Sequence, residues 1–145
     1  MEIYIGADHR GYAMKEGLVA WLAEQGHDVH DMGASEYKDQ DDYPDYAFAV
    51  AKEVAASDDR RGLLLCGSGV GMAVAANKVR GVRAALVHDT KTIKAARNDD
   101  DVNVLALGAD SIPLEEAKRA ITVFLETPFS GEERHLRRIQ KLENI

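Results

Sequence analysis

The 145-residue chain is poor in cysteine, proline and aromatic residues, and it has no long apolar run. Its one cysteine excludes an internal disulfide framework, and a lone thiol suits the reducing cytoplasm. No stretch of about 18 apolar residues is present, so no transmembrane helix is expected. The N-terminus also lacks the basic and apolar segments of a secretory signal peptide. We therefore expect a cytoplasmic protein.

Positive charge is also scarce, because 18 lysine and arginine residues are outnumbered by 25 aspartate and glutamate residues, for a formal net charge of −7. Nucleic acids and anionic membranes attract proteins with a basic patch, so neither is an expected partner. Apolar residues make up 46% of the chain, which supports one packed core at this length. We expect a single domain over residues 1–145.

Apolar periodicity predicts strands and helices in alternation along the chain. The expected strands are Glu2–Ala7, Asp28–Met32, Leu63–Leu65 with Cys66 at its end, Ala84–Val87 and Val102–Leu107. The expected helices are Tyr12–Gln25, Pro44–Ala56, Met72–Lys78, Thr90–Asn98, Leu114–Leu125 and Glu132–Leu142. This alternation predicts a five-stranded parallel sheet with helices on both faces.

Open parallel sheets bind ligands at the carboxyl ends of their strands. On that ground the candidate site comprises the turns at Asp8–His9, Cys66–Gly71 and His88–Asp89, together with the segment before the fifth strand. Each of these turns carries a side chain that can transfer a proton or bind an anion. The topology therefore predicts one site to which several distant segments contribute.

The stretch Leu63–Lys78 combines a buried strand, a glycine turn and an alanine-rich helix. Free N–H groups at such a turn and helix start form an anion site. The turn is not a Walker A loop, because no Gly-Lys-Ser/Thr follows, and Met72 replaces the third glycine of a dinucleotide fingerprint. A cysteine-phosphatase loop is also excluded, because it needs an arginine where Met72 stands.

Cys66 ends the central strand and directly precedes the glycine turn. A lone cysteine is more often a small buried hydrophobe, but a thiolate facing a backbone anion site suits abstraction of a proton next to a carbonyl. The N–H groups of the turn would stabilise the enediolate oxygen that forms. Ser68, inside the turn, either donates to a substrate oxygen or serves the turn alone.

Two further segments carry candidate binding residues. His9 follows the first expected strand and is a candidate contact for a phosphate or hydroxyl group. Arg134 and Arg138 lie four residues apart on one face of the last helix, and arginine pairs bind phosphate well. The alternative for that helix is a solvated surface paired with neighbouring glutamates. An acidic cluster without EF-hand spacing is expected to be solvated; its members are Asp39, Asp41, Asp42 and Asp45.

Four segments resemble the ribose-5-phosphate isomerase B / galactose-6-phosphate isomerase family, and the likeness covers nearly the whole chain. They are GADHRGY (6–12), DYPDYA (42–47), CGSGVG with the following AANK (66–78), and FSGEERHLRRI (129–139). The resemblance implies a three-layer α/β/α Rossmann-like sandwich that forms a homodimer, with a tetramer as the alternative. It also implies isomerisation of an aldose phosphate to a ketose phosphate through an enediolate, without metal or cofactor. In the family the sites form between subunits, so the resemblance implies that the C-terminal helix, about residues 132–142, reaches a partner.

The resemblance also assigns roles to individual residues. Part of the family uses a glutamate base where this chain has Met72, so the branch with Cys66 as base is indicated. The implied substrate-binding positions are Asp8, His9, Tyr43, Gly67, Ser68, Gly69, Val70, Gly71, Arg134 and Arg138. Among these, the backbone of the glycine turn holds the enediolate, and His9 with the two arginines holds the phosphate.

Three positions depart from the family pattern. Asp99 and Asp100 stand where the family usually has a His-Asn pair that opens the sugar ring and contacts the substrate. Asp110 stands where the family often has a phosphate-binding arginine. An aspartate can still move a proton, so we assign Asp99 as the ring-opening group and Asp100 as a substrate contact. Arg10, beside His9, is the candidate to offset the lost positive charge.

The residues and the resemblance together predict interconversion of ribose 5-phosphate and ribulose 5-phosphate, a reaction of the pentose phosphate pathway. The catalytic residues are Cys66, Ser68 and Asp99. One alternative is an isomerase of a hexose phosphate or of a rare free sugar. The other is a binding module for a sugar phosphate or nucleotide that has lost catalysis. Cys66 and Ser68 argue against the module, because binding alone needs no thiol.

Overall fold

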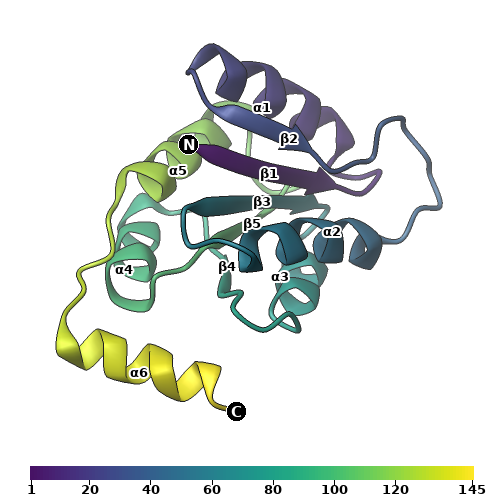
Figure 1. Cartoon of the computed structure of the whole chain (residues 1–145). Coiled ribbons are helices and arrows are strands. Elements are labelled where there is room, and N and C mark those ends of the chain that lie inside the picture. The colour runs from purple at the N-terminus through teal and green to yellow at the C-terminus, as the bar shows by residue number, and fades with distance from the viewer.

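Five parallel strands form the centre of the fold, and helices cover both faces of the sheet (Figure 1). The computed structural model describes all 145 residues. The strands are β1 (Glu2–Ala7), β2 (Asp28–Asp31), β3 (Arg60–Cys66), β4 (Ala84–Leu86) and β5 (Val104–Gly108). The helices are α1 (Tyr12–Glu24), α2 (Tyr43–Ala55), α3 (Val70–Ala76), α4 (Thr90–Asp100), α5 (Leu114–Glu126) and α6 (Glu133–Glu143). The sheet order is β2-β1-β3-β5-β4 and every pair is parallel, so the predicted α/β/α architecture is confirmed.

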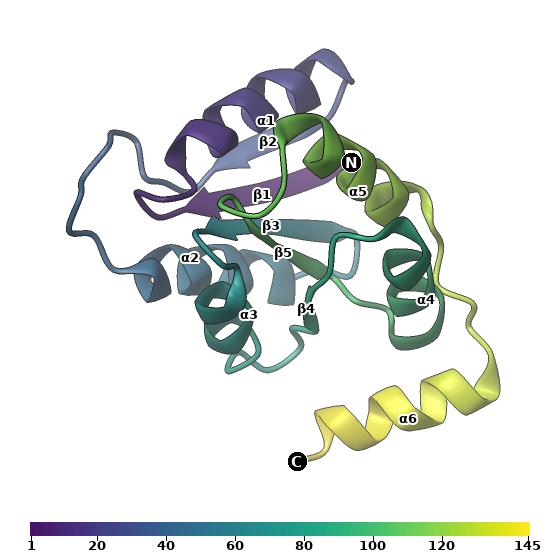
Figure 2. The same cartoon turned by 180° about the vertical axis from the view of Figure 1, so that it is seen from behind.

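Two apolar cores, one on each face of the sheet, hold the layers together. Alternate residues of β3 point to opposite faces, so Leu63 and Leu65 join one core while Leu64 and Cys66 join the other. Helices α1, α4 and α5 close the first core, and α2 and α3 close the second (Figures 1 and 2). Burial on both faces explains why the sequence of β3 is a continuous apolar run.

The sequence located every strand and helix but misplaced several ends. Helix α3 begins at Val70, two residues before the expected Met72, because the glycine turn is already complete at Gly69. Gly69 has a φ of 80°, a left-handed conformation that glycine adopts at little cost. Strand β5 begins at Val104 rather than Val102, since the Val102 N–H still donates to a carbonyl of α4.

Helix α4 runs past its expected end at Asn98 and stops at Asp100. The buried Arg97 side chain supports this last turn, because its Nη1 donates to Asp101 Oδ1 (2.7 Å) and to the carbonyl oxygen of Val102 (2.6 Å). Aspartate is a poor helix former, so propensity alone predicts an earlier end. Hydrogen bonds from one buried arginine to the residues that follow the helix therefore support this boundary.

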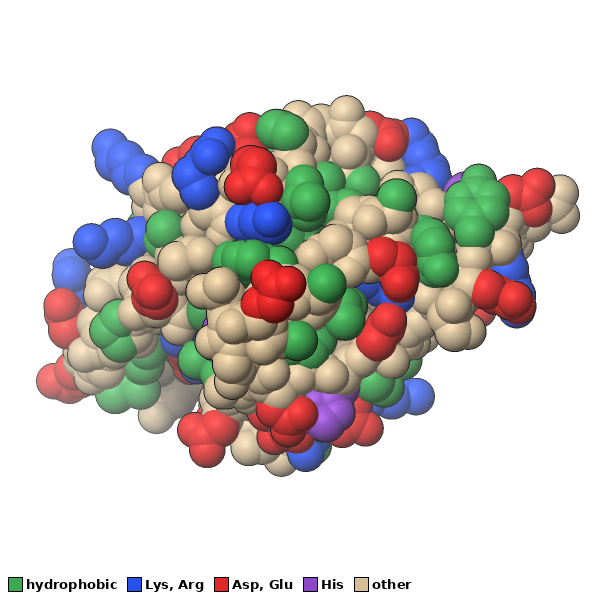
Figure 3. Space-filling model, turned by 90° about the horizontal axis from the view of Figure 1, so that it is seen from above, with side chains coloured by type: hydrophobic (Ala, Val, Ile, Leu, Met, Phe, Trp, Pro, Cys, Tyr) green, Lys and Arg blue, Asp and Glu red, His purple; other side chains and the backbone are tan.

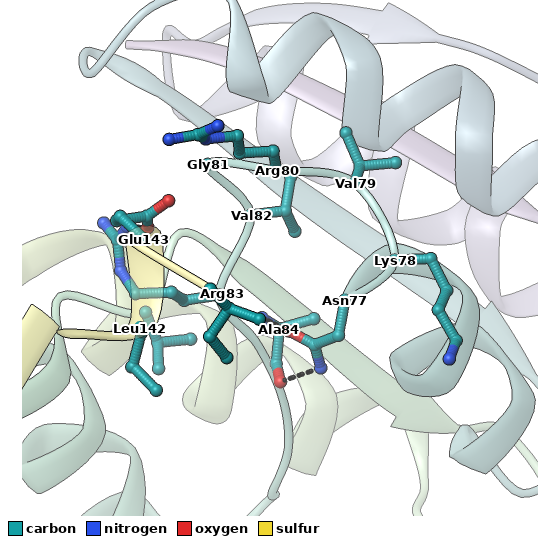
Figure 4. Close-up of a pocket in the computed structure, with 12 residues that line it drawn as sticks. Asn77, Lys78, Val79, Arg80, Gly81, Val82, Arg83, Ala84, Leu142 and Glu143 are labelled. Atoms are coloured by element: carbon teal, nitrogen blue, oxygen red, sulfur yellow. Dashed lines mark hydrogen bonds and ion pairs between the residues drawn. The ribbon is translucent and has the colours of Figure 1, made fainter. Parts of the chain in front are cut away.

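Helix α6 projects away from the sheet at the end of an extended segment (Figures 1 and 2). His135 anchors its start, because the side chain is buried and its Nδ1 lies 2.6 Å from Ser130 Oγ. At its far end, Arg83 Nη1 donates to Glu143 Oε1 (2.7 Å) beside a groove of about 510 Å³ (Figure 4). Large apolar side chains of this C-terminal segment nevertheless remain exposed; they are Leu136, Leu142 and Ile145.

Figure 3 shows acidic and basic side chains among apolar and neutral ones over the face seen from above. None of the helices combines the length and the apolar character that crossing a lipid bilayer requires.

Lys15 is a buried charged residue on α1. Its side chain has no exposed surface, and its Nζ donates to Asp31 Oδ2 (2.5 Å) at the end of β2 and to Glu16 Oε1 (2.8 Å). Burial disfavours the ammonium charge, but these hydrogen bonds outweigh burial and raise the pKa of Lys15 above its usual value. The Lys15–Asp31 ion pair ties α1 to β2.

We expect Asp31→Ala to lower the free energy of unfolding by about 2–3 kcal/mol, because it removes one of two partners from a buried charge. Glu16→Ala is the matched control and should cost little, since the Glu16 side chain is 53% exposed. The raised pKa of Lys15 means that this stabilisation is present at neutral pH and is lost as the pH rises through that value. Urea unfolding measures the free energy of unfolding of both variants. Equal losses of stability would contradict the role of Asp31 as the main partner of the buried Lys15 charge.

Candidate active site

The carboxyl ends of β1, β3 and β5 meet at one edge of the sheet, and backbone hydrogen bonds lock them together. The Asp8 N–H donates to the carbonyl oxygen of Leu65 (3.3 Å). The Ala109 N–H donates to the carbonyl oxygen of Cys66 (2.8 Å), and the Asp110 N–H donates to that of Gly67 (3.0 Å). The turns after three strands therefore form one rigid edge with Cys66 at its centre.

The Cys66 thiol faces the glycine turn that follows it. The residue is 6% exposed, and its Sγ accepts a hydrogen bond from the Gly69 N–H at 3.1 Å. Position 69 favours glycine strongly, because its φ is positive and a Cβ there would lie 2.9 Å from the backbone carbonyl carbon of Leu107. An N–H directed at sulfur stabilises negative charge on it, which is the state a base requires.

Ser68 and Tyr43 border the same turn. Ser68 is exposed, and its Oγ accepts from the Val70 N–H (3.3 Å), which leaves the hydroxyl hydrogen free to donate. The Tyr43 ring lies against Gly71, since a Cβ on that glycine would come within 2.7 Å of Tyr43 Cζ. A cavity of about 290 Å³ opens beside the turn; it is lined by Ser68, Leu86, Val87, His88, Ala106, Leu107, Gly108 and Ser111. Met72 is fully buried in the second core.

His9 is held by Asp41, a residue that the sequence had placed in a solvated loop. Asp41 Oδ1 accepts from the His9 backbone N–H (3.0 Å) and lies 2.7 Å from His9 Nδ1. The Asp41 side chain is only 6% exposed, so the expectation of a solvated carboxylate is wrong at this position. The two residues lie 32 positions apart, so no local sequence pattern predicts their contact.

The hydrogen bonds to Asp41 decide its ionisation. Burial of the carboxyl favours its neutral form, but the hydrogen bonds from the side chain and backbone of His9 outweigh burial and lower the pKa of Asp41 below its usual value. The Asp41 carboxylate therefore accepts the Nδ1 hydrogen of His9, which leaves His9 Nε2 available to a substrate. This arrangement fixes the imidazole in one orientation.

Asp8 shapes the turn that carries His9. It is 5% exposed, and its Oδ1 accepts from the backbone N–H groups of Arg10 (3.0 Å) and Gly11 (3.2 Å). Asp8, His9 and Asp41 each place a possible metal-ligand atom within 4.8 Å of the others. Asp8 Oδ1 and His9 Nδ1 already take part in these internal hydrogen bonds, so Asp8 holds the turn backbone while Asp41 orients the His9 ring.

The remaining predicted site residues lie elsewhere in the chain. Asp99 and Asp100 end α4, and because α4 runs opposite to the strands, they lie at the amino edge of the sheet. The prediction that groups the segment before β5 with Cys66 is therefore wrong within one chain. Arg134 and Arg138 are exposed on α6, whose His135 Nε2 lies 3.7 Å from Asp99 Oδ1. These four residues form a second group, apart from Cys66; the group comprises Asp99, Asp100, Arg134 and Arg138.

We expect Asp41→Asn to lower kcat/KM about tenfold, because a neutral amide holds the His9 imidazole less firmly than a carboxylate does. Asp42→Asn, one residue later and exposed, is the matched control and should change kcat/KM little. The lowered pKa of Asp41 means that its stabilising contribution is present above the usual aspartate pKa and is lost as the pH falls through the lowered value. Equal effects of the two substitutions on kcat/KM would exclude this role.

The fold and this edge define the class of protein. It is a Rossmann-like α/β protein whose thiol, glycine turn and oriented histidine gather where such folds bind ligands. Residues 3–142 match the model of the Ribose/Galactose Isomerase family, and the chain belongs to that family.

Relatives and solved structures resemble the chain over nearly its whole length. A probable ribose-5-phosphate isomerase B of Mycoplasma pneumoniae is 43% identical over 140 residues, covering 97% of this chain and 91% of the relative. A putative sugar phosphate isomerase of Bacillus subtilis is 40% identical, covering 99% and 96%.

Among solved structures, ribose-5-phosphate isomerase B from Mycoplasma genitalium with bound ribulose-5-phosphate has a TM-score of 0.94 at 41% identity, covering 99% of this chain and 94% of that one. The type B enzyme of Trypanosoma cruzi has a TM-score of 0.92 at 42% identity, covering 99% and 97%. The predicted family and the predicted fold are both confirmed by these matches.

Proposed function

We propose that the chain interconverts ribose 5-phosphate and ribulose 5-phosphate by proton transfer at Cys66. The observation that supports this most is the thiol at the end of β3, which accepts the Gly69 N–H at 3.1 Å at the start of the glycine turn. The likeness to ribose-5-phosphate isomerases over almost the entire chain supports the same substrate. The reaction belongs to the pentose phosphate pathway.

In the open-chain aldose, the Cys66 thiolate takes the proton from C2, and the electron pair moves toward the C1 carbonyl to form an enediolate. The Gly69 and Val70 N–H groups already donate to Cys66 Sγ and Ser68 Oγ, so the other N–H groups of the turn and the free hydroxyl hydrogen of Ser68 stabilise the developing oxygen charge. The thiol then returns the proton to C1, while the proton on O2 leaves and one is gained at O1, which gives the ketose. No metal or cofactor enters these steps.

We further propose that the working unit is a homodimer in which each site is built from two chains. Asp99, Asp100, Arg134 and Arg138 cannot serve the Cys66 of their own chain, because they lie at the opposite edge of the sheet. Helix α6 projects outward with exposed apolar side chains, which suits packing on a second copy (Figure 2). In that arrangement the α6 arginines bind phosphate in the neighbouring site, and Asp99 opens the sugar ring there.

A base that must remain a free thiol also favours the cytoplasm, where the reducing potential preserves it. Cys66 is the only cysteine of the chain, so no internal disulfide can protect or regulate it.

A substrate panel tests the proposed reaction. The purified protein, in EDTA, is assayed with ribose 5-phosphate, a hexose 6-phosphate, and free ribose and allose. We expect kcat/KM to be highest for ribose 5-phosphate. A higher kcat/KM for a hexose phosphate or a free sugar would contradict ribose 5-phosphate as the substrate. Binding of a sugar without turnover would favour a binding module.

A further inference from the structure

Arg10 and Asp110 form an ion pair across the end of the central strand. Arg10 follows β1 and Asp110 follows β5, and these strands flank β3 on either side. Arg10 Nη2 donates to Asp110 Oδ2, so the pair spans the point where β3 ends at Cys66. Both side chains are about half exposed, at 56% and 51%. The pair is therefore a charged element on the rim of the candidate site.

The Arg10 guanidinium lies directly on the glycine turn. A Cβ on Gly67 would lie 2.3 Å from Arg10 Cζ and 2.4 Å from its Nε, so any larger residue there would push the guanidinium away from this position. Glycine at position 67 therefore allows the guanidinium to rest against the backbone next to Cys66. Gly67 thus opens space for an arginine as well as shaping the turn.

Backbone hydrogen bonds fix both members of the pair relative to Cys66. The Arg10 N–H donates to Asp8 Oδ1 (3.0 Å), which holds the start of the arginine in a tight turn. The Asp110 N–H donates to the carbonyl oxygen of Gly67 (3.0 Å), which holds the aspartate beside the same turn. The backbone of each member is therefore held beside the glycine turn, and the ion pair joins their side chains.

We propose that Arg10 is a phosphate-binding residue of the substrate site and that Asp110 is the positioning residue that holds its guanidinium over Gly67. This inference rests on the proposed reaction, whose substrate carries a phosphate. A guanidinium has five N–H donors, and Asp110 occupies one, so the exposed donors can bind a phosphate oxygen. His9, the neighbouring residue, presents its free Nε2 at the same edge.

The ion pair also predicts how Asp110 affects the affinity of the site for phosphate. Its carboxylate orients Arg10, but its negative charge opposes a phosphate that approaches the same guanidinium. Asparagine keeps the hydrogen-bond acceptor and removes the charge. Asp110→Asn should therefore tighten phosphate binding, and it should do so only when Arg10 is present.

The test measures binding of inorganic phosphate by calorimetry and KM and kcat for ribose 5-phosphate. It uses the full-length protein with Arg10→Gln, Asp110→Asn and the double substitution. Arg119→Gln on α5 is the matched control, since it removes an exposed arginine remote from the strand ends. Thermal unfolding verifies that each variant is folded.

Arg10→Gln is expected to weaken phosphate binding about tenfold or more and to raise KM more than it lowers kcat. Asp110→Asn is expected to tighten phosphate binding several-fold alone, and by less than about twofold once Arg10 is glutamine. The proposal is overturned if Arg10→Gln has no more effect than Arg119→Gln, or if Asp110→Asn acts equally in both backgrounds. Phosphate binding is measured without turnover, so failure of the proposed reaction is a separate result.

Discussion

Cys66→Ala is expected to lower kcat for ribose 5-phosphate by about 10²–10⁴-fold while leaving the protein folded. The substitution removes the group that takes the C2 proton, and it leaves the N–H groups of Gly67–Gly71 in place. Substrate binding uses other side chains, so KM should change far less than kcat. Steady-state kinetics on the two proteins measures the effect.

Cys66→Ser is the informative control, because it keeps a small polar group on β3 but has no accessible anion at neutral pH. It should be nearly as inactive as Cys66→Ala. Since Cys66 is 6% exposed and packs in the second core, urea unfolding must show that both variants retain most of their stability. Near-normal turnover by either folded variant would remove Cys66 from the mechanism.

Mixing two inactive variants should restore activity. One variant carries Cys66→Ala, and the other carries Arg134→Ala with Arg138→Ala; each homodimer alone is expected to lose about 10²-fold or more in kcat/KM. In a mixed dimer, one site combines the intact Cys66 of one chain with the intact arginines of the other. Random pairing should therefore return about a quarter of the normal number of sites.

Native mass spectrometry shows whether mixed dimers have formed. The two variants are mixed by unfolding and refolding them together. Each variant unfolded and refolded alone is the control, and it should stay inactive. If mixed dimers form and activity does not return, each site draws its cysteine and arginines from one chain, and the shared-site proposal fails. A protein that remains monomeric would exclude the shared site as well.

Much of the fold follows from local patterns in the sequence. The apolar run of β3 predicts a strand buried on both faces, and Leu63, Leu64 and Leu65 are indeed fully buried. Alternation of strands and helices predicts a parallel sheet, and every strand pair is parallel. The motif around Cys66 predicts the family, which the family model confirms over residues 3–142.

What the sequence could not predict depends on contacts between distant residues. Asp41 lies in a polar loop and looks solvated, yet the fold buries it against His9. Arg10 and Asp110 are 100 positions apart, so their pairing emerges only when β1 and β5 flank β3.

The position of Asp99 shows a different limit of sequence reasoning. A residue just before a strand is close in sequence to a site that follows the strand. In space the two are separated by the full length of the strand. Strand β5 (Val104–Gly108) separates Asp99 from Asp110, so the two aspartates lie at opposite edges of the sheet. A role for Asp99 at Cys66 therefore requires a second chain.

Solvent exchange during turnover tests proton transfer at Cys66 most directly. Ribose 5-phosphate is incubated with the protein in D2O containing EDTA, and NMR follows C1 of the ketose and C2 of the aldose over many turnovers. The account predicts conversion with deuterium accumulating at both carbons, and neither conversion nor deuterium with Cys66→Ala. Conversion to equilibrium without deuterium would indicate a hydride shift, and deuterium uptake by the alanine variant would indicate another base; either result would contradict the account.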